Sequence, residues 1–238
     1  MFYHKTNFWF FYNGYKNIDF DVQVVQRPNI PAPVKKVSYI DVAGVDGGLT
    51  ETDGTYEHIE IKVPMNFIVT PKENFWVHAR KVKNWLSDSG ELEFSDDPDV
   101  FYKVKNARLD SEIERIMRRA GSFSALFTCD PYTYFKAGRT LLPVSECELN
   151  PYRLSKPKYH IEGNGTCKLT VNGTDVLLAV NGDLIVDTTL MAMYKEDGTI
   201  QNNKSRCPYE KLFFNPGRNH VSITSGHILR IEPNWRSL

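Results

Sequence analysis

The sequence predicts a mainly β protein whose first half also holds one helix, and three observations predict this fold class. Dipeptides typical of tight hairpin turns recur along the chain, short runs between them alternate apolar and polar residues, and one stretch has helical periodicity instead. The turn dipeptides are Asn13-Gly14, Asp46-Gly47, Asp53-Gly54, Asn164-Gly165, Asn172-Gly173, Asn181-Gly182 and Asp197-Gly198.

The expected strands lie between these turns. Ile59, Ile61 and Val63 alternate with polar residues, which gives one buried and one exposed face at the strand period of two. The same pattern predicts strands at 37–42, 167–171, 176–180, 184–187, 220–224 and 228–231. Residues 113–117 also fit a weak helix, but the alternation through 123–127 favours a strand there.

The N-terminal aromatic run differs from these strands because both of its faces are apolar. It consists of Phe8, Trp9, Phe10, Phe11 and Tyr12. The face turned away from the core must be covered, either by a second sheet of the same chain or by a neighbouring subunit, and the sequence leaves both open. We therefore take these five residues as a candidate subunit interface.

One helix is expected near 71–88. Apolar residues recur there at three- and four-residue spacing, namely Phe75, Ala79, Val82, Trp85 and Leu86. Thr70 is the expected N-cap, Pro71 suits the first turn, and Glu73 completes a capping box. Gly90 is the expected stop.

Prolines predict the domain boundary. Pro143, Pro151 and Pro157 interrupt a stretch in which no clean periodicity survives. The sequence thus predicts a mixed domain at 1–138 with one helix, a linker at 139–156, and an all-β domain at 157–238 that suggests a sandwich.

Composition and charge exclude several classes of protein. The 29 basic and 29 acidic residues cancel, which argues against a dominant basic surface and direct nucleic-acid recognition. The N-terminus lacks the basic region and cleavage site of a signal segment, so we expect a cytoplasmic start and no membrane insertion. The four cysteines are irregularly spaced without a C-x-x-C pair, which predicts buried free thiols.

The residue types that enzymes use for catalysis form no recognisable motif in this sequence. Asp96, Asp97 and Asp99 crowd around Pro98 and suggest either a metal or glycosidase site or a solvated turn, and the turn is favoured. There is no nucleophile elbow and no phosphate-binding glycine loop. We therefore expect no catalytic, cofactor-binding or metal-binding residues, and no enzyme.

An ordered series of motifs resembles the distal tail proteins of long, flexible-tailed bacteriophages, and it covers nearly the whole chain. In the first half the motifs are Phe10, Asn13-Gly14, Ile18-Asp19-Phe20, Arg27-Pro28, Val42, Gly44, Asp46-Gly47, Asp53, Tyr56, Trp85-Leu86, Leu92, Phe94, Asp96-Asp97-Pro98-Asp99, Tyr102, Phe127, Cys129, Pro131 and Tyr132. In the second half they are Pro157, Ile161, Gly163-Asn164-Gly165, Asn172-Gly173, Ile185-Val186-Asp187, Met193-Tyr194, Pro216-Gly217, Asn219 and 231–236.

The resemblance implies a structural role in the virion. N-terminal domains would build a six-fold ring, which can also pack back to back with a second ring, and C-terminal galectin-like sandwiches would project outwards. The implied partners are other copies of the chain, the tail tube protein, a tail-tip protein that often carries a lysin, and receptor-binding or baseplate proteins. Such a protein is assembled in the bacterial cytoplasm and needs no cofactor.

A carbohydrate-binding host-recognition module is the alternative. Phe214-Asn215-Pro216 and Arg218-Asn219 resemble part of the sugar-binding sequence of galectins, but Gly217 intervenes and the preceding histidine is missing. Stacking faces for a sugar would come from Tyr159, Tyr209 and Trp235. The competing interpretation is that Tyr159 and Trp235 fill core or inter-domain contacts.

Overall fold

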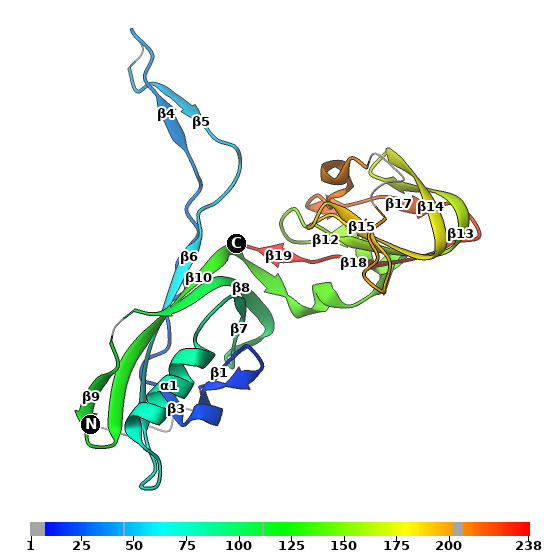
Figure 1. Ribbon diagram of the computed structural model, residues 1–238. Helices are drawn as coiled ribbons and strands as arrows, with labels where there is room; N and C mark the ends of the chain where they lie inside the picture. Colours follow the sequence, from blue (N-terminus) through cyan, green and yellow to red (C-terminus); the bar gives the residue numbers. More distant parts are fainter. Residues whose placement is uncertain (1–7, 45, 111, 202–206) are drawn as a thin grey trace. The chain divides into compact units, whose positions relative to one another are not determined.

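The computed structural model describes residues 8–44, 46–110, 112–201 and 207–238 (Figure 1). The chain divides into two compact units, one up to Thr133 and the other from Tyr134 to Ser237. Both units are built mainly from antiparallel strands, so the predicted mainly β fold class is confirmed. The prediction that the two parts fold independently stays a prediction.

The N-terminal unit is organised around one sheet with the strand order β2-β1-β7-β8-β10-β6-β3, and β9 pairs with β10. Its strands are β1 (Phe10–Tyr12), β2 (Tyr15–Lys16), β3 (Val22–Val24), β6 (Ile59–Ile68), β7 (Gly90–Phe94), β8 (Asp97–Leu109), β9 (Glu114–Met117) and β10 (Ala120–Phe135). The long pair β6 and β10 runs from Ile68 opposite Ala120 to Ile59 opposite Cys129. The strand prediction for 113–117 and 123–127 is confirmed.

The helix α1 (Phe75–Trp85) is shorter than predicted, and the predicted cap was wrong. Asn74 is the N-cap: its side-chain oxygen accepts hydrogen bonds from the backbone N–H groups of Trp76 and Val77 at 2.9 and 3.4 Å. Thr70 instead accepts from the Glu73 N–H in the preceding turn. Gly90 begins β7 and does not end the helix.

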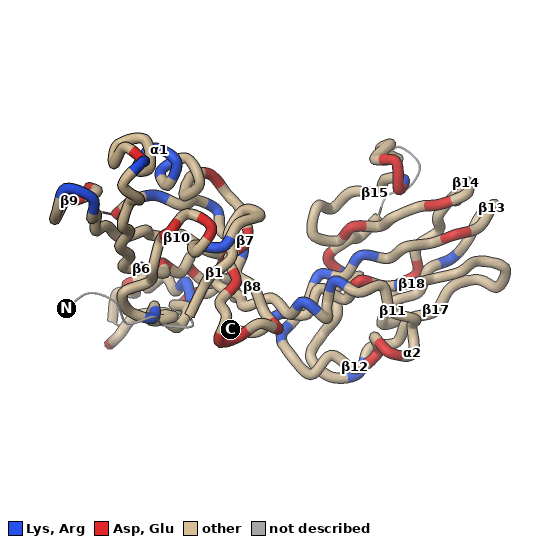
Figure 2. Tube along the Cα trace, turned by 90° about the horizontal axis from the view of Figure 1, so that it is seen from below, with Lys and Arg blue, Asp and Glu red and all other residues tan. Residues whose placement is uncertain are grey.

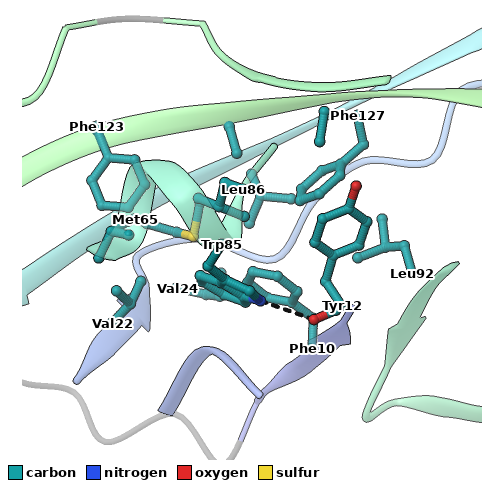
Figure 3. Packing of buried hydrophobic residues seen from close by; sticks show 14 of the residues in the cluster. Phe10, Tyr12, Val22, Val24, Met65, Trp85, Leu86, Leu92, Phe123 and Phe127 are labelled. Atoms are coloured by element: carbon teal, nitrogen blue, oxygen red, sulfur yellow. Dashed lines mark hydrogen bonds between the residues drawn. The ribbon is translucent and has the colours of Figure 1, made fainter. Parts of the chain in front are cut away.

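The core of this unit lies between α1 and the sheet. Figure 3 shows Trp85 of the helix beside Phe10 and Tyr12 of β1, with Met65 and Phe127 from the two long strands. The Trp85 ring stacks on Phe10 at 5.4 Å, and its Nε1 donates to the Tyr12 carbonyl at 2.8 Å. The apolar helical stripe is therefore buried against the alternate residues of the strands.

The C-terminal unit is a second antiparallel sheet with the order β11-β18-β13-β14-β15, and β17 pairs with β13. Its elements are β11 (Leu142–Pro143), α2 (Val144–Cys147), β12 (Leu149–Asn150), β13 (Lys158–Val171), β14 (Thr174–Asp187), β15 (Ala192–Tyr194), β16 (Gly217–Arg218), β17 (Val221–Ile223), β18 (Ile228–Glu232) and β19 (Arg236–Ser237). A short 3-10 helix at Tyr209–Leu212 lies over its core.

The segment expected as the linker 139–156 holds β11, α2 and β12. Cys147 and Asn150 in it are fully buried, and β11 pairs with β18. Asn150 Nδ2 donates to the carbonyl of Arg153 at 2.9 Å. No clean periodicity is seen in this segment because its strands are only two residues long. The segment is part of the C-terminal unit.

Two of the expected hairpin turns lie inside a single strand pair. Asn164-Gly165 and Asn181-Gly182 face each other in the continuous ladder of β13 and β14, whose turn is Asn172-Gly173. The φ angles of Gly163 and Gly165 are +150° and +102°. Glycine pairs in a strand interior mark a bend or bulge, which the sequence does not distinguish from a turn. The predicted strands 176–180 and 184–187 are consequently one strand.

Candidate interaction surfaces

Three of the five predicted interface residues are core residues of their own unit. Phe8, Phe10 and Tyr12 are buried. Tyr12 packs edge-on against Phe127 at 5.1 Å, and its hydroxyl donates to the Asp88 carbonyl at 2.9 Å. The sequence did not show that α1 and β10 cover this face, so the interface assignment of these three residues is corrected.

Trp9 and Phe11 lie on the opposite face of the same segment and are half-buried. The ammonium of Lys16 lies 4.3 Å from the centre of the Trp9 ring, a cation–π contact that keeps this ring in place. Phe11 stands between Lys16 of β2 and Glu93 of β7 in the sheet register. These two side chains remain the part of the predicted interface that a neighbouring subunit can reach.

A hairpin arm at residues 25–58 is the most exposed part of the N-terminal unit (Figure 1). Its short strands β4 (Ser38–Ile40) and β5 (Leu49–Glu51) pair only with each other. Nearer its base, Lys35 bridges to Tyr56. None of the described residues 25–44 and 46–58 is buried.

The arm carries apolar side chains that its own unit does not cover. Tyr39 is 76% exposed, and Val34, Ile40, Val42 and Leu49 are exposed as well. An isolated two-stranded hairpin is at best marginally stable in water. Exposed apolar surface of this kind is typical of sites that contact another molecule. The alternation at 37–42 predicted a strand with one buried face, and the sequence did not show that this strand leaves the sheet and stays exposed.

A groove lies at the opposite end of the N-terminal unit, between the start of α1 and the turn from β9 to β10. Phe75, Trp76, Arg115, Arg118 and Arg119 line it. Arg115 holds one side: its guanidinium carbon lies 5.1 Å from the Phe75 ring centre, and its Nη2 donates to the Arg118 carbonyl at 2.6 Å. Trp76 is 51% exposed.

Glu73, a carboxylate that lines the groove, is already paired with cationic neighbours. Glu73 accepts from Lys81 Nζ at 2.7 Å, and its other oxygen lies 3.2 Å from His78 Nδ1. The hydrogen bond from Lys81 and that of His78 hold the pKa of Glu73 below its ordinary value. Among the described residues, the guanidinium groups of Arg118 and Arg119 have no hydrogen bond or ion pair. The three arginines therefore make the groove basic, and Figure 2 shows basic residues gathered beside β9.

The solvated turn favoured from the sequence is present, but it holds only Ser95 and Asp96; Asp97 and Asp99 begin β8, and all three aspartates are exposed. Phe94 of β7 pairs with Asp97 of β8, so the turn is tight. Asp96 pairs with Arg27 at 3.8 Å between exposed side chains. Within the described ranges, no group of three His, Cys, Asp or Glu side chains has the spacing to hold a metal ion.

The three aromatic residues considered for sugar stacking do not form one platform. Tyr159 is fully buried and its hydroxyl donates to the Leu212 carbonyl at 2.6 Å. Tyr209 packs against the same core. Trp235 instead lies near Tyr152, with ring centres 6.3 Å apart. The competing interpretation of Tyr159 as a core residue is therefore correct.

The cysteines are free, as predicted, and Cys129, Cys147 and Cys167 are buried while Cys207 is partly buried. Burial raises the pKa of the Cys129 and Cys147 thiols to about 12. Such thiols stay protonated and unreactive at neutral pH. None of the helices in the described part of the chain is both long and apolar enough to cross a membrane.

Sequence comparison finds a family match within the N-terminal unit. Residues 15–129 match the family described as the phage tail protein RIFT-related domain. This match covers the arm, α1 and most of the main sheet. No curated protein sequence matches the chain.

Two solved structures share the fold of the whole chain. The Dit protein of phage SPP1, described as a paradigm of the hub adsorption apparatus in phages that infect Gram-positive bacteria, matches with a TM-score of 0.65 and 15% identity over 98% of this chain and 100% of that one. A chain of the phage P2 baseplate matches with a TM-score of 0.52 and 9% identity over 98% and 99% of the two chains. Together with the domain match, these likenesses confirm the predicted resemblance.

Proposed function

We propose that this chain, a phage tail protein of the distal tail type, forms the ring-shaped hub that joins the tail tube to the tail tip and baseplate. The observation that carries the proposal is the shared fold with the SPP1 hub protein over nearly the full length of both chains. The domain match at residues 15–129 supports it independently, because it rests on sequence and not on fold. As a tail protein, the chain is part of the virion.

A ring of six copies fits the surfaces of the N-terminal unit. A closed ring of identical subunits needs two different complementary patches on each subunit. The arm and the half-buried pair Trp9 and Phe11 are apolar surfaces that the unit does not bury by itself. We assign the ring contacts to this unit and leave the C-terminal sheet free to face other tail components.

The proposed partners follow from the same role. One face of the ring meets the tail tube protein, and the other meets the tail-tip protein. Receptor-binding or baseplate proteins attach at the rim. The proposal gives the chain no catalytic role, because the matched family and the matched structures are those of tail and baseplate components.

Native mass spectrometry of the purified protein, with electron microscopy of the same sample, tests the proposal. A species of six copies and a ring-shaped particle are expected, either alone or after addition of the tail tube and tail-tip proteins of the same phage. A protein that stays monomeric at about 100 μM, with and without these partners, contradicts it. Saccharide binding tighter than about 100 μM, near 5.5 kcal/mol, would favour the host-recognition alternative instead.

A further inference from the structure

We infer that the tip of the arm of one copy docks into the basic groove between α1 and β9 of a second copy. The arm tip comprises the described residues 37–44 and 46–51, and the basic groove is the one lined by Phe75, Trp76, Arg115, Arg118 and Arg119. The inference rests on the proposed function, since it assumes that copies of the chain assemble with one another.

Charge is the first argument. Between Val37 and Glu51 the sequence has three carboxylates, Asp41, Asp46 and Glu51, and no lysine or arginine. The groove has three arginines within five residues, at 115, 118 and 119. Opposite charges across a contact fix the register of two partners and suppress wrong ones. The arm tip and the groove are thus complementary in sign.

The apolar surfaces of the two partners match as well. Tyr39, Ile40 and Leu49 are exposed on the arm tip. Trp76 of the groove is half exposed, and Met117, which precedes Arg118 in the chain, is exposed at the end of β9. Interfaces of proteins are enriched in aromatic residues, methionine and arginine, and this groove presents all three. Docking would remove apolar surface of both partners from water.

The position of the arm excludes the groove of its own copy. The arm leaves the sheet at Ile59, where β6 is opposite Cys129, whereas the groove lies beside the other end of β6, where Ile68 is opposite Ala120. The nine-residue step between these ends is about 30 Å at 3.3 Å per residue. The groove on that end is tied to the sheet by the Val69 N–H, which donates to the Arg119 carbonyl at 2.8 Å.

The arm is long enough to reach a second copy. The stretch from Gly47 to Ile59 spans about 40 Å when extended at 3.3 Å per residue. That length is similar to the diameter of a domain of this size. A contact from an arm at one end to a groove at the other end is head-to-tail, the type of contact that closed rings are built from.

A charge-swap experiment tests the inference. The groove variant is Arg118→Glu/Arg119→Glu, and the arm variant is Asp41→Lys/Asp46→Lys. All four side chains are exposed and none has an ion pair within the described part of the chain, so both variants should fold with unchanged far-UV spectra and melting temperature. Each is expected to raise the protein concentration at half assembly about tenfold or more, measured by sedimentation velocity at low salt.

The decisive sample is a single chain that carries both charge reversals, which restores opposite charges on the two sides of the contact. Assembly should return to near the wild-type concentration. The matched controls reverse exposed charges elsewhere: Asp97→Lys/Asp99→Lys in the N-terminal unit and Lys211→Glu/Arg218→Glu in the C-terminal unit. Both controls should assemble like the wild type.

Two results overturn the inference, and they are distinguishable. If the wild type forms rings and the groove and arm variants form them at the same concentration, the arm–groove contact is wrong and the ring-forming function stands. The inference is equally wrong if each reversal blocks assembly but their combination does not restore it. If the wild type never assembles, with or without tail partners, both the inference and the proposed function fail.

Discussion

Replacing Phe10 by alanine tests whether Phe10 is a core residue or an interface residue. Phe10 is fully buried, stacks on Trp85 at 5.4 Å and meets Phe127 edge-on at 6.0 Å. Phe→Ala at such a position lowers the free energy of unfolding by about 3–5 kcal/mol. The two aromatic contacts account for about 0.5–1.5 kcal/mol each. With a urea m-value of about 1–3 kcal/mol/M, the unfolding midpoint should fall by about 1–5 M.

The assay is urea unfolding followed by tryptophan fluorescence, because Trp85 lies directly against the substituted ring. Phe11→Ala is the matched control: Phe11 is half-buried on the other face of the same strand and should cost about 1 kcal/mol or less. The shift for Phe10→Ala should not depend on protein concentration. An unchanged midpoint in the monomer, together with loss of assembly, would refute the assignment of Phe10 to the core.

Three further predictions concern the cap, a charged cluster and the two units. Asn74→Ala should lower the free energy of unfolding by about 1 kcal/mol and Thr70→Ala by much less, measured by urea unfolding; equal effects would restore Thr70 as the cap. His160, whose Nε2 lies 3.2 Å from Glu232 Oε1, and then Lys158, at 3.3 Å, hold the pKa of Glu232 below its ordinary value of 4.5. The stabilisation by Glu232 is therefore present above about pH 4.5 and lost as the pH falls through the lower pKa of the folded protein. Glu232→Gln should accordingly lower the melting temperature at pH 7 but not below the folded pKa, and a pH-independent difference contradicts this. Finally, we expect residues 134–238 expressed alone to show a cooperative melting transition by calorimetry; an unfolded fragment would argue against independent folding.

The local pattern of the sequence determined which segments are strands and where the helical stripe lies. Alternation at 59–63 predicts β6, and the spacing from Phe75 to Leu86 predicts α1, because burial of one face imposes a period on the residues themselves. The turn at Asn172-Gly173 was also readable, since few residue pairs tolerate positive φ in succession. The order of these motifs along the chain was enough to indicate the phage tail family.

Only the tertiary structure decided what covers each apolar face. Phe10 and Phe11 are both aromatic neighbours in one strand, but α1 covers the first, while the second is half-buried on the other face of the strand. Asn181-Gly182 has the composition of a turn but lies in a ladder, where it is paired with Asn164 and Gly163 of β13. Residues 37–42 of the arm alternate like the strands of the main sheet, yet the unit buries none of the arm's described residues. A sequence pattern indicates that a side chain avoids water. It does not indicate which segment covers that side chain, because this depends on contacts between residues far apart in sequence or in different chains.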